Sequence, residues 1–185
     1  MASMATMPVS RPLTIEDFET IRDAAVDGRR YELVDGSLVV TPSPSWRHQV
    51  VSSRLMAALL ASDPDPDRLV VLHAPLDVRL STDSVVQPDL MVFDTDEPGP
   101  RRPVLAVEIL SPSTRHIDMG LKWSRYAAAG IGHYWMVDPE EPSVTAWLLE
   151  GGAYVEDGRA SGDDPVALRR PWSVTLVPAD LVRGA

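Results

Sequence analysis

Apolar residues recur at helical spacing in three stretches of the chain, and each stretch has a start or stop signal beside it. The first follows Thr14, a residue suited to cap a helix, and ends at Gly28. The second follows Ser43-Pro44-Ser45, and the third spans Asp118–Ala129 before Gly130. We therefore expect three helices, well separated along the chain.

Shorter apolar runs bounded by Gly, Pro or Asp predict strands. Arg30–Val34 and Ser37–Thr41 flank Asp35-Gly36, which supplies the positive φ angles of a tight β-hairpin turn. The other strand-like runs are, in chain order, Leu69–Leu80 with a break at Pro75, Val85–Phe93, Pro103–Leu110, His133–Val137, Val144–Leu149, Tyr154-Val155 and Ser173–Val177. This order of elements predicts a mixed α/β (α+β) domain with a central sheet that is mostly antiparallel or mixed.

The 185 residues suit one domain, which we place at 13–185 after a flexible segment over 1–12. No apolar run approaches the roughly 18 residues of a membrane span, and Met1–Ser10 lacks the basic start and apolar stretch of a signal peptide. These features favour a cytoplasmic protein with no membrane partner. The sequence has no cysteine, which excludes disulfide scaffolds, thiol nucleophiles and cysteine-ligated zinc.

The overall charge argues at first against a nucleic-acid partner. The chain has 27 acidic and 17 basic residues, a net charge of −10, which disfavours non-specific binding to a polyanion. The charge is uneven, however, because Arg29–Arg54 and Arg101–Tyr126 are each net positive. Much of the acidic excess lies in Asp63–Glu97. A site built from the two positive segments could therefore still receive a phosphate group.

Lys122 is the only lysine of the chain, and every other residue among its 17 basic ones is an arginine. One interpretation is a surface ion pair with Asp118, four residues earlier, which would contribute only about a few tenths of a kcal/mol. Arginine would serve in such a pair equally well. A compact ammonium that points at an attacking water or a phosphoryl oxygen has a role in which arginine is not equivalent, so we favour a functional Lys122.

Asp89 and Glu108 each lie in an otherwise apolar predicted strand. Antiparallel pairing about Pro98-Gly99 places Asp89 opposite Glu108, with Cβ atoms roughly 5 Å apart. Two buried like charges at that distance need a cation between them, and Mg²⁺ prefers oxygen ligands of this kind. The alternatives are that each acid pairs with an arginine or that one of them is protonated.

Several motifs together resemble a known nuclease superfamily. They are, in chain order, Tyr31-Glu32-Leu33-Val34-Asp35-Gly36, Gln87-Pro88-Asp89-Leu90, Val107-Glu108-Ile109-Leu110-Ser111-Pro112-Ser113-Thr114, Asp118 with Lys122 and Tyr126, and Tyr134-Trp135-Met136-Val137-Asp138-Pro139. With these motifs the chain resembles the PD-(D/E)XK nucleases and, more narrowly, the bacterial putative restriction endonuclease domain family. The resemblance extends over about residues 13–155.

The resemblance implies a restriction-endonuclease-like core, in which helices flank a central mixed β-sheet, with an N-terminal helix and β-hairpin. It also implies that Asp89 and Glu108 are metal ligands and that Glu32 completes the acidic cluster. The alternative for Glu32 is an ion pair with Arg29 or Arg30.

One position departs from the superfamily pattern. That pattern places a lysine two residues after the glutamate, where this chain has Leu110. The resemblance therefore implies that the lysine comes from the following helix, which fits Lys122.

The resulting hypothesis is an endonuclease that hydrolyses DNA phosphodiester bonds with Mg²⁺ or Mn²⁺ bound by Asp89 and Glu108. Lys122 would orient the attacking water or stabilise the developing charge, and Glu32 would tune or join the metal site. Candidate contacts to the substrate phosphates are Arg29, Arg30, Arg101, Arg102, Arg115 and His48. A possible homodimer would give a longer positive surface.

Two other functions fit the sequence. A catalytically inactive nuclease-fold module for binding or assembly is favoured by the net charge and by Trp46, Trp123 and Trp172, which we expect to be exposed. Such a module would bind no metal. A phosphodiesterase acting on RNA or on a small substrate would bind metal without cleaving DNA.

Overall fold

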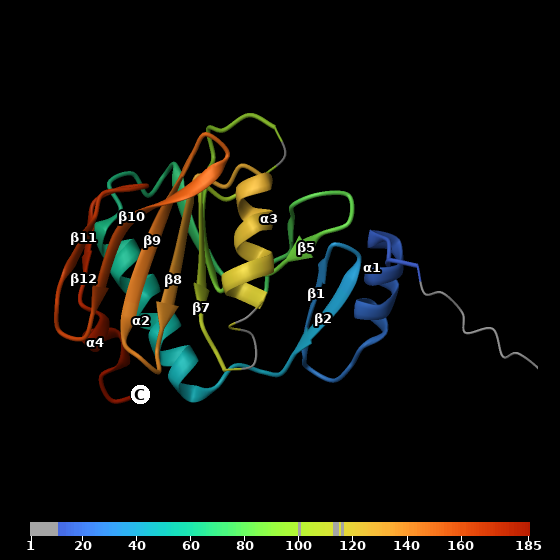
Figure 1. Cartoon of the computed structure of the whole chain (residues 1–185), viewed down its shortest axis with the longest axis horizontal. Helices are drawn as coiled ribbons and strands as arrows, with labels where there is room; N and C mark the ends of the chain where they lie inside the picture. The colour runs from blue at the N-terminus through green and yellow to red at the C-terminus, as the bar shows by residue number, and fades with distance from the viewer. Residues whose placement is uncertain (1–10, 100, 113–114, 116) are drawn as a thin grey trace, which may run out of the picture.

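The chain folds around a six-stranded sheet (Figure 1). The computed structural model describes residues 11–99, 101–112, 115 and 117–185, so most of the segment expected to be flexible lies outside the described residues. Within this part of the chain the sheet has the order β10-β9-β8-β7-β6-β3. Its strands are β3 (Leu69–His73), β6 (Leu90–Asp94), β7 (Leu105–Ile109), β8 (His133–Asp138), β9 (Ser143–Glu150) and β10 (Ala153–Ser161). Because β7 and β8 run parallel and the other neighbours antiparallel, the sheet is mixed, which confirms the prediction.

A second, four-stranded sheet lies beside the first, in the order β2-β1-β5-β4 (Figure 1). Its strands are β1 (Arg30–Val34), β2 (Ser37–Thr41), β4 (Val78–Arg79) and β5 (Val85–Val86). The predicted hairpin is present, and Asp35 and Gly36 take the positive φ angles of its turn, 51° and 71°. Helix α1 (Ile15–Ala24) packs on this sheet, where Phe18 forms a buried cluster with Leu33 and Val85.

All three predicted helices are present, and capping residues fix where the first two begin. Thr14 and Asp17 bond reciprocally in a capping box at the start of α1. Ser45 caps α2 (Trp46–Ser62), because its hydroxyl accepts the backbone N–H of His48 at 3.2 Å. The third helix begins as a π-helical segment, η1 (Ile117–Lys122), and continues as α3 (Trp123–Ala128). Among the helices described, none is long and apolar enough to cross a membrane.

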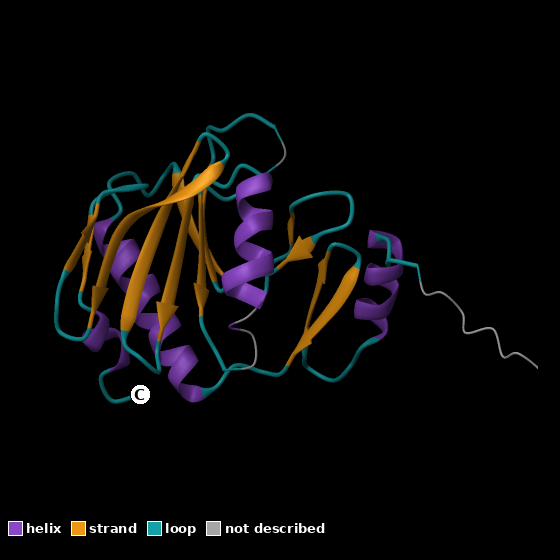
Figure 2. Cartoon of the chain, in the orientation of Figure 1, coloured by secondary structure: helices purple, strands orange, loops and turns teal. Residues whose placement is uncertain are grey.

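Helices cover both faces of the central sheet (Figure 2). The face of α2 that carries Leu55 packs against the side of the sheet that includes Val107 of β7. On the opposite side, Ala106 of β7 shares a buried cluster with Tyr126 of α3. Because side chains alternate along a strand, Glu108 lies on the α3 side. The same cluster includes residues of the smaller sheet, so α3 packs between the two sheets.

The predicted strand Val85–Phe93 is wrong as a single element. It divides into β5, in the smaller sheet, and β6, in the central sheet, and the link between them is Gln87-Pro88-Asp89. The Gln87 N–H donates to the Glu32 carboxylate at 2.7 Å, and Pro88 has no N–H, so neither residue joins a strand ladder. The chain therefore crosses from one sheet to the other at this point. The predicted break at Pro75 in the run Leu69–Leu80 is confirmed, because β3 ends before it and β4 begins after it.

Near the C-terminus the sequence patterns predicted one strand correctly and missed two elements. Strand β12 (Val174–Leu176) confirms the predicted strand Ser173–Val177. It pairs with β11 (Val166–Leu168) and precedes α4 (Pro178–Val182), neither of which was predicted. Strand β10 extends to Ser161, well beyond the predicted Tyr154-Val155. These elements pack on the α2 side of the central sheet, where they extend its apolar core.

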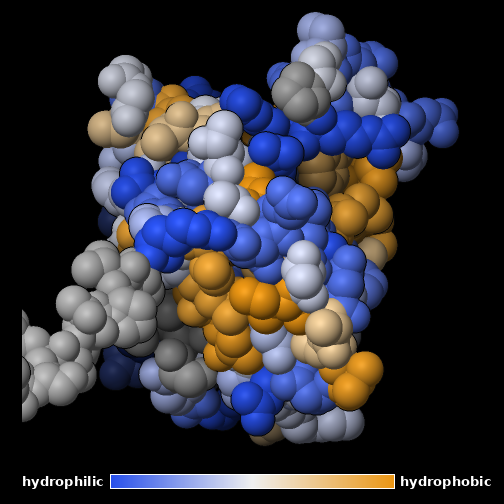
Figure 3. Space-filling model, turned by 90° about the vertical axis from the view of Figure 1, so that its right-hand side faces the viewer, coloured by the Kyte–Doolittle hydropathy of each residue, from blue (hydrophilic) through white to orange (hydrophobic). Residues whose placement is uncertain are grey.

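The prediction that Trp46, Trp123 and Trp172 are exposed is only partly correct. Trp46 is 75% exposed and Trp123 is half-buried, whereas Trp172 is buried and donates from Nε1 to Ser62 Oγ at 2.9 Å. Figure 3 shows the side of the molecule beside α1, where hydrophobic areas lie among hydrophilic ones. Of the three tryptophans invoked for an assembly surface, Trp46 alone is strongly exposed.

Candidate active site

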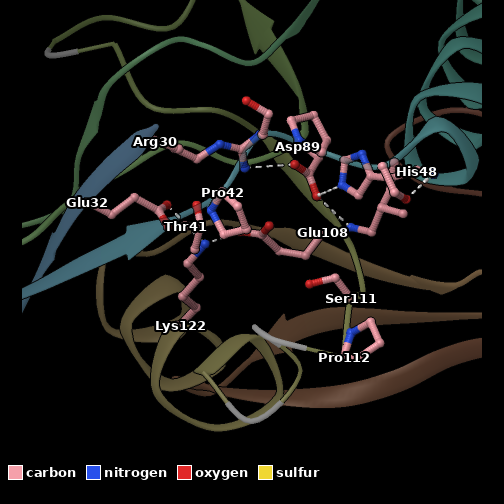
Figure 4. A pocket seen from close by; sticks show the side chains of 14 residues that line it. Arg30, Glu32, Thr41, Pro42, His48, Asp89, Glu108, Ser111, Pro112 and Lys122 are labelled. Atoms are coloured by element: carbon pink, nitrogen blue, oxygen red, sulfur yellow. Dashed lines mark hydrogen bonds and ion pairs between the residues drawn. The ribbon is translucent and has the colours of Figure 1, made fainter. Parts of the chain in front are cut away.

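A cavity of about 220 Å³ lies where the two sheets meet (Figure 4). Its charged and imidazole side chains are Arg30 and Glu32 from β1, His48 from α2, Asp89 from the crossing between the sheets, Glu108 from β7 and Lys122 from η1. Loop and strand residues complete the lining: Thr41, Pro42, Ser43, Pro44, Ser45, Ile109, Ser111 and Pro112. The four residues predicted to be catalytic thus line one cavity, although they belong to four separate segments: Glu32, Asp89, Glu108 and Lys122.

Asp89 is 4% exposed and is held by three donors. Its Oδ1 accepts Arg30 Nη1 at 2.8 Å, and its Oδ2 accepts the backbone N–H of Ile109 at 2.8 Å and lies 3.1 Å from His48 Nε2. Burial alone would raise the pKa of this carboxyl, but the hydrogen bond and charge of His48, the charge of Arg30 and the Ile109 N–H outweigh it. The pKa of Asp89 is therefore lowered to about 2, and the carboxylate is ionised at neutral pH.

Glu108 is 2% exposed and receives two donors from the same helical segment. Its Oε1 accepts the Tyr126 hydroxyl at 2.5 Å and lies 3.2 Å from Lys122 Nζ. Burial, together with the charges of Glu108 and Glu32, raises the pKa of the Tyr126 hydroxyl well above its usual value. Tyr126 is therefore a permanent donor to this carboxylate.

Lys122 lies between two carboxylates rather than on the surface. The side chain is 3% exposed, and its Nζ is 2.9 Å from Glu32 Oε1 and 3.2 Å from Glu108 Oε1. Glu32, which is 1% exposed, faces this ammonium and not the Arg29 or Arg30 guanidinium of the alternative interpretation. Lys122 is buried and not on the surface, whereas the predicted ion pair with Asp118 involves a side chain that lies outside the described residues.

The register of β6 and β7 is the one expected from the sequence. Leu90 pairs with Val107, as an antiparallel turn centred on Pro98-Gly99 requires. Asp89 comes one residue before this register, and its Oδ2 accepts the backbone N–H of Ile109, the residue after Glu108. The repulsion between the Asp89 and Glu108 carboxylates is relieved by protein cations, Arg30 at Asp89 and Lys122 at Glu108, so the alternative of pairing with an arginine is realised at Asp89.

The predicted phosphate contacts separate into two groups. Arg30 and His48 line the cavity, whereas Arg29, Arg101, Arg102 and Arg115 do not. The Arg115 guanidinium donates to Asp138 at 2.5 Å. Arg101 and Arg102 precede β7, at the opposite end of that strand from Glu108, and line a different hollow. The positive segments of the sequence therefore coincide with the site only in part.

The donor set fits a hard divalent cation held by two carboxylates. Asp89 and Glu108 both line the cavity, and Mg²⁺ is commonly held by one or two carboxylates together with water and substrate phosphate. Within the described part of the chain, no group of three or more His, Asp or Glu side chains is arranged to hold a metal ion. In this geometry Glu32 contacts Lys122 instead of completing a three-carboxylate cluster.

Sequence reasoning assigned no role to two groups that hold the carboxylates. Tyr126 follows Lys122 by four residues, and residues four apart share one face of a helix, so this signal was available. The bond from the Gln87 N–H to Glu32 was not detectable, because the two residues are 55 positions apart and meet only when the smaller sheet forms.

A mixed sheet flanked by helices, with acidic side chains and a lysine gathered beside it, defines the restriction-endonuclease-like class of nuclease folds, as the sequence predicts. The chain belongs to the Uma2 family, described as putative restriction endonuclease, whose model matches residues 15–176. The fold is also that of a solved structure, described as a putative nuclease belonging to DUF820 from Anabaena variabilis ATCC 29413. That structure has a TM-score of 0.69 and 18% sequence identity, over 93% of this chain and 98% of the other. Among curated proteins, none matches the chain.

Proposed function

We propose that the protein is a metal-dependent endonuclease that hydrolyses DNA phosphodiester bonds at a site formed by Asp89, Glu108 and Lys122. One observation carries the proposal: two carboxylates and the single lysine, each at most 4% exposed, line one cavity. Burying such ions costs several kcal/mol each unless they are paired. Their placement at a cavity, rather than in a closed core, favours a chemical role, and membership of a nuclease family supports the reaction class.

Asp89 and Glu108 are the residues that would hold Mg²⁺ or Mn²⁺. When bound, the ion would polarise the phosphoryl group and lower the pKa of a coordinated water. Arg30, His48 and the Ile109 N–H fix the orientation of Asp89 and keep it ionised. The hydrogen bond from the Tyr126 hydroxyl fixes the orientation of Glu108.

Two cations of the chain, Lys122 and Arg30, line the cavity in which the substrate phosphate would bind. The Lys122 ammonium, held at 3.2 Å from Glu108 Oε1, can donate to an attacking water or to a phosphoryl oxygen as negative charge develops. Arg30, whose side chain is 20% exposed, reaches the cavity from β1 and can bond a non-bridging phosphate oxygen. His48 holds Asp89 and lines the same cavity.

The test is cleavage of supercoiled plasmid and of single-stranded DNA in the presence of Mg²⁺ or Mn²⁺. We expect Asp89→Ala and Glu108→Ala to abolish cleavage, and Lys122→Arg to lower it by about 10²-fold or more. Glu140→Gln is the matched control, because Glu140 is an exposed carboxylate paired with Arg47 at 3.4 Å and should leave cleavage unchanged.

Each alternative predicts a different result. Full activity of Lys122→Arg would refute the role of the lysine, and cleavage that persists with a chelator would refute the metal. Cleavage of RNA or of a small phosphodiester, but not of DNA, would assign another substrate. A wild-type protein that binds no Mn²⁺ would be an inactive nuclease-fold module. The homodimer and the cytoplasmic location stay predictions, and light scattering tests the first of them.

A further inference from the structure

We infer that Lys122 occupies the place of a second cation, so that the site binds one divalent ion per chain, and that Glu32 positions Lys122 instead of binding metal. The inference rests on the proposed metal site of Asp89 and Glu108. It adds the number of divalent ions bound per chain and a role for the Glu32 carboxylate.

The Lys122 ammonium bridges the carboxylates of Glu32 and Glu108. Lys122 Nζ lies 2.9 Å from Glu32 Oε1 and 3.2 Å from Glu108 Oε1. A divalent ion shared by Glu32 and Glu108 would need the same space between their oxygens, so the ammonium and that ion exclude each other. Asp89 and Glu108, which line the same cavity, are therefore the carboxylates that would hold the ion, without Glu32.

One oxygen of Glu32 contacts two donors from separate segments of the chain. Its Oε1 accepts the Gln87 N–H at 2.7 Å as well as Lys122 Nζ. Gln87 lies two residues before Asp89, so the same oxygen anchors both the ammonium and the crossing that carries Asp89. With these two donors on one oxygen, Glu32 acts through Lys122 and is a positioning residue.

Counting bound Mn²⁺ without DNA, by calorimetry or by electron paramagnetic resonance, tests the inference. The wild-type protein should bind one ion, as should the Glu140→Gln control. Lys122→Met should bind two, because the ion can then take the place of the ammonium. The double variant Glu32→Gln with Lys122→Met should return to one, because the second position has lost a carboxylate.

The single lysine allows a second measurement that needs no variant of Lys122. A protein labelled with ¹³Cε-lysine gives one lysine resonance, because the chain has one lysine. Mg²⁺ should leave this resonance away from the position of solvent-exposed lysine, since the ammonium stays between its carboxylates. Glu32→Gln should move the resonance, because it removes the charge at 2.9 Å, whereas Glu140→Gln should not.

The outcomes separate the inference from the proposed function. A wild-type protein that binds two ions, or a lysine resonance that Mg²⁺ moves to the solvent-exposed position, would overturn the inference alone. A Lys122→Met variant that still binds one ion would also overturn the inference alone. A wild-type protein that binds no ion would overturn the proposed metal-dependent function and the inference with it. If Lys122→Met does not fold, the wild-type count and the lysine resonance still decide.

Discussion

Removal of the Tyr126 hydroxyl measures how strongly the buried Glu108 carboxylate depends on its protein donors. In Tyr126→Phe, Glu108 loses the hydrogen bond of 2.5 Å but keeps the Lys122 ammonium at 3.2 Å. A hydrogen bond to a charged group contributes about 1.5–3 kcal/mol, so we expect the free energy of unfolding to fall by about 2 kcal/mol. The ring of residue 126 still packs against Tyr134, with centroids 5.2 Å apart, so the change isolates the hydroxyl.

Tyr154→Phe is the matched control. Tyr154 belongs to the same buried cluster, but its hydroxyl donates to a neutral acceptor, the Ile131 carbonyl, at 2.8 Å. Its removal should cost about 1 kcal/mol. Urea unfolding gives both values, and the melting temperature of a chain of this size should fall by about 4–8 °C for Tyr126→Phe and 2–4 °C for Tyr154→Phe. If Tyr154→Phe destabilises as much as Tyr126→Phe, the reasoning that Tyr126 bonds an ionised carboxylate is refuted.

Further predictions concern Asp89 and the N-terminal elements. Because the pKa of Asp89 is lowered from 3.8 to about 2, its contribution to stability is complete above about pH 4 and is lost as the pH falls toward 2. The free energy of unfolding of Asp89→Asn, measured in urea, should therefore change less over this pH interval than that of the wild type. Gly36→Ala should destabilise by well over 1 kcal/mol in the same assay, because a Cβ there would lie 2.5 Å from Pro12 Cβ, whereas Gly130→Ala, at a similar positive φ with open space, should cost only about 1 kcal/mol. Thr14→Ala should cost about 1 kcal/mol through loss of the capping box, and an unchanged urea midpoint would contradict that role.

Local patterns predicted the parts of the fold that local interactions specify. The Asp35-Gly36 turn and the Thr14 cap act within a few residues, and both are present. The Pro98-Gly99 turn predicted the register of β6 and β7, because the centre of a hairpin turn determines which residues of two antiparallel strands lie opposite each other. The lysine count pointed to Lys122 without any structural information.

Long-range interactions account for most of what the sequence did not predict. The division of Val85–Phe93 depends on Glu32, whose carboxylate takes the Gln87 N–H from another strand. Trp172 is buried in the core cluster beside α2, and its hydrogen-bond acceptor is Ser62, 110 positions earlier. The pairing of Glu32 with Lys122, rather than with a neighbouring arginine, appears only when α3 packs between the sheets. No periodicity within one element carries such information.

Because the site is formed where the chain crosses between the sheets at Gln87-Pro88-Asp89, its geometry depends on how the two sheets are positioned relative to each other. Glu32 belongs to the smaller sheet and Glu108 to the central sheet, and Lys122 connects their carboxylates. A rigid-body displacement of one sheet by an ångström or two would lengthen these ion pairs while leaving both ladders intact. Any partner that shifts the N-terminal sheet could therefore switch the site off at a distance, without contacting a single residue of the cavity.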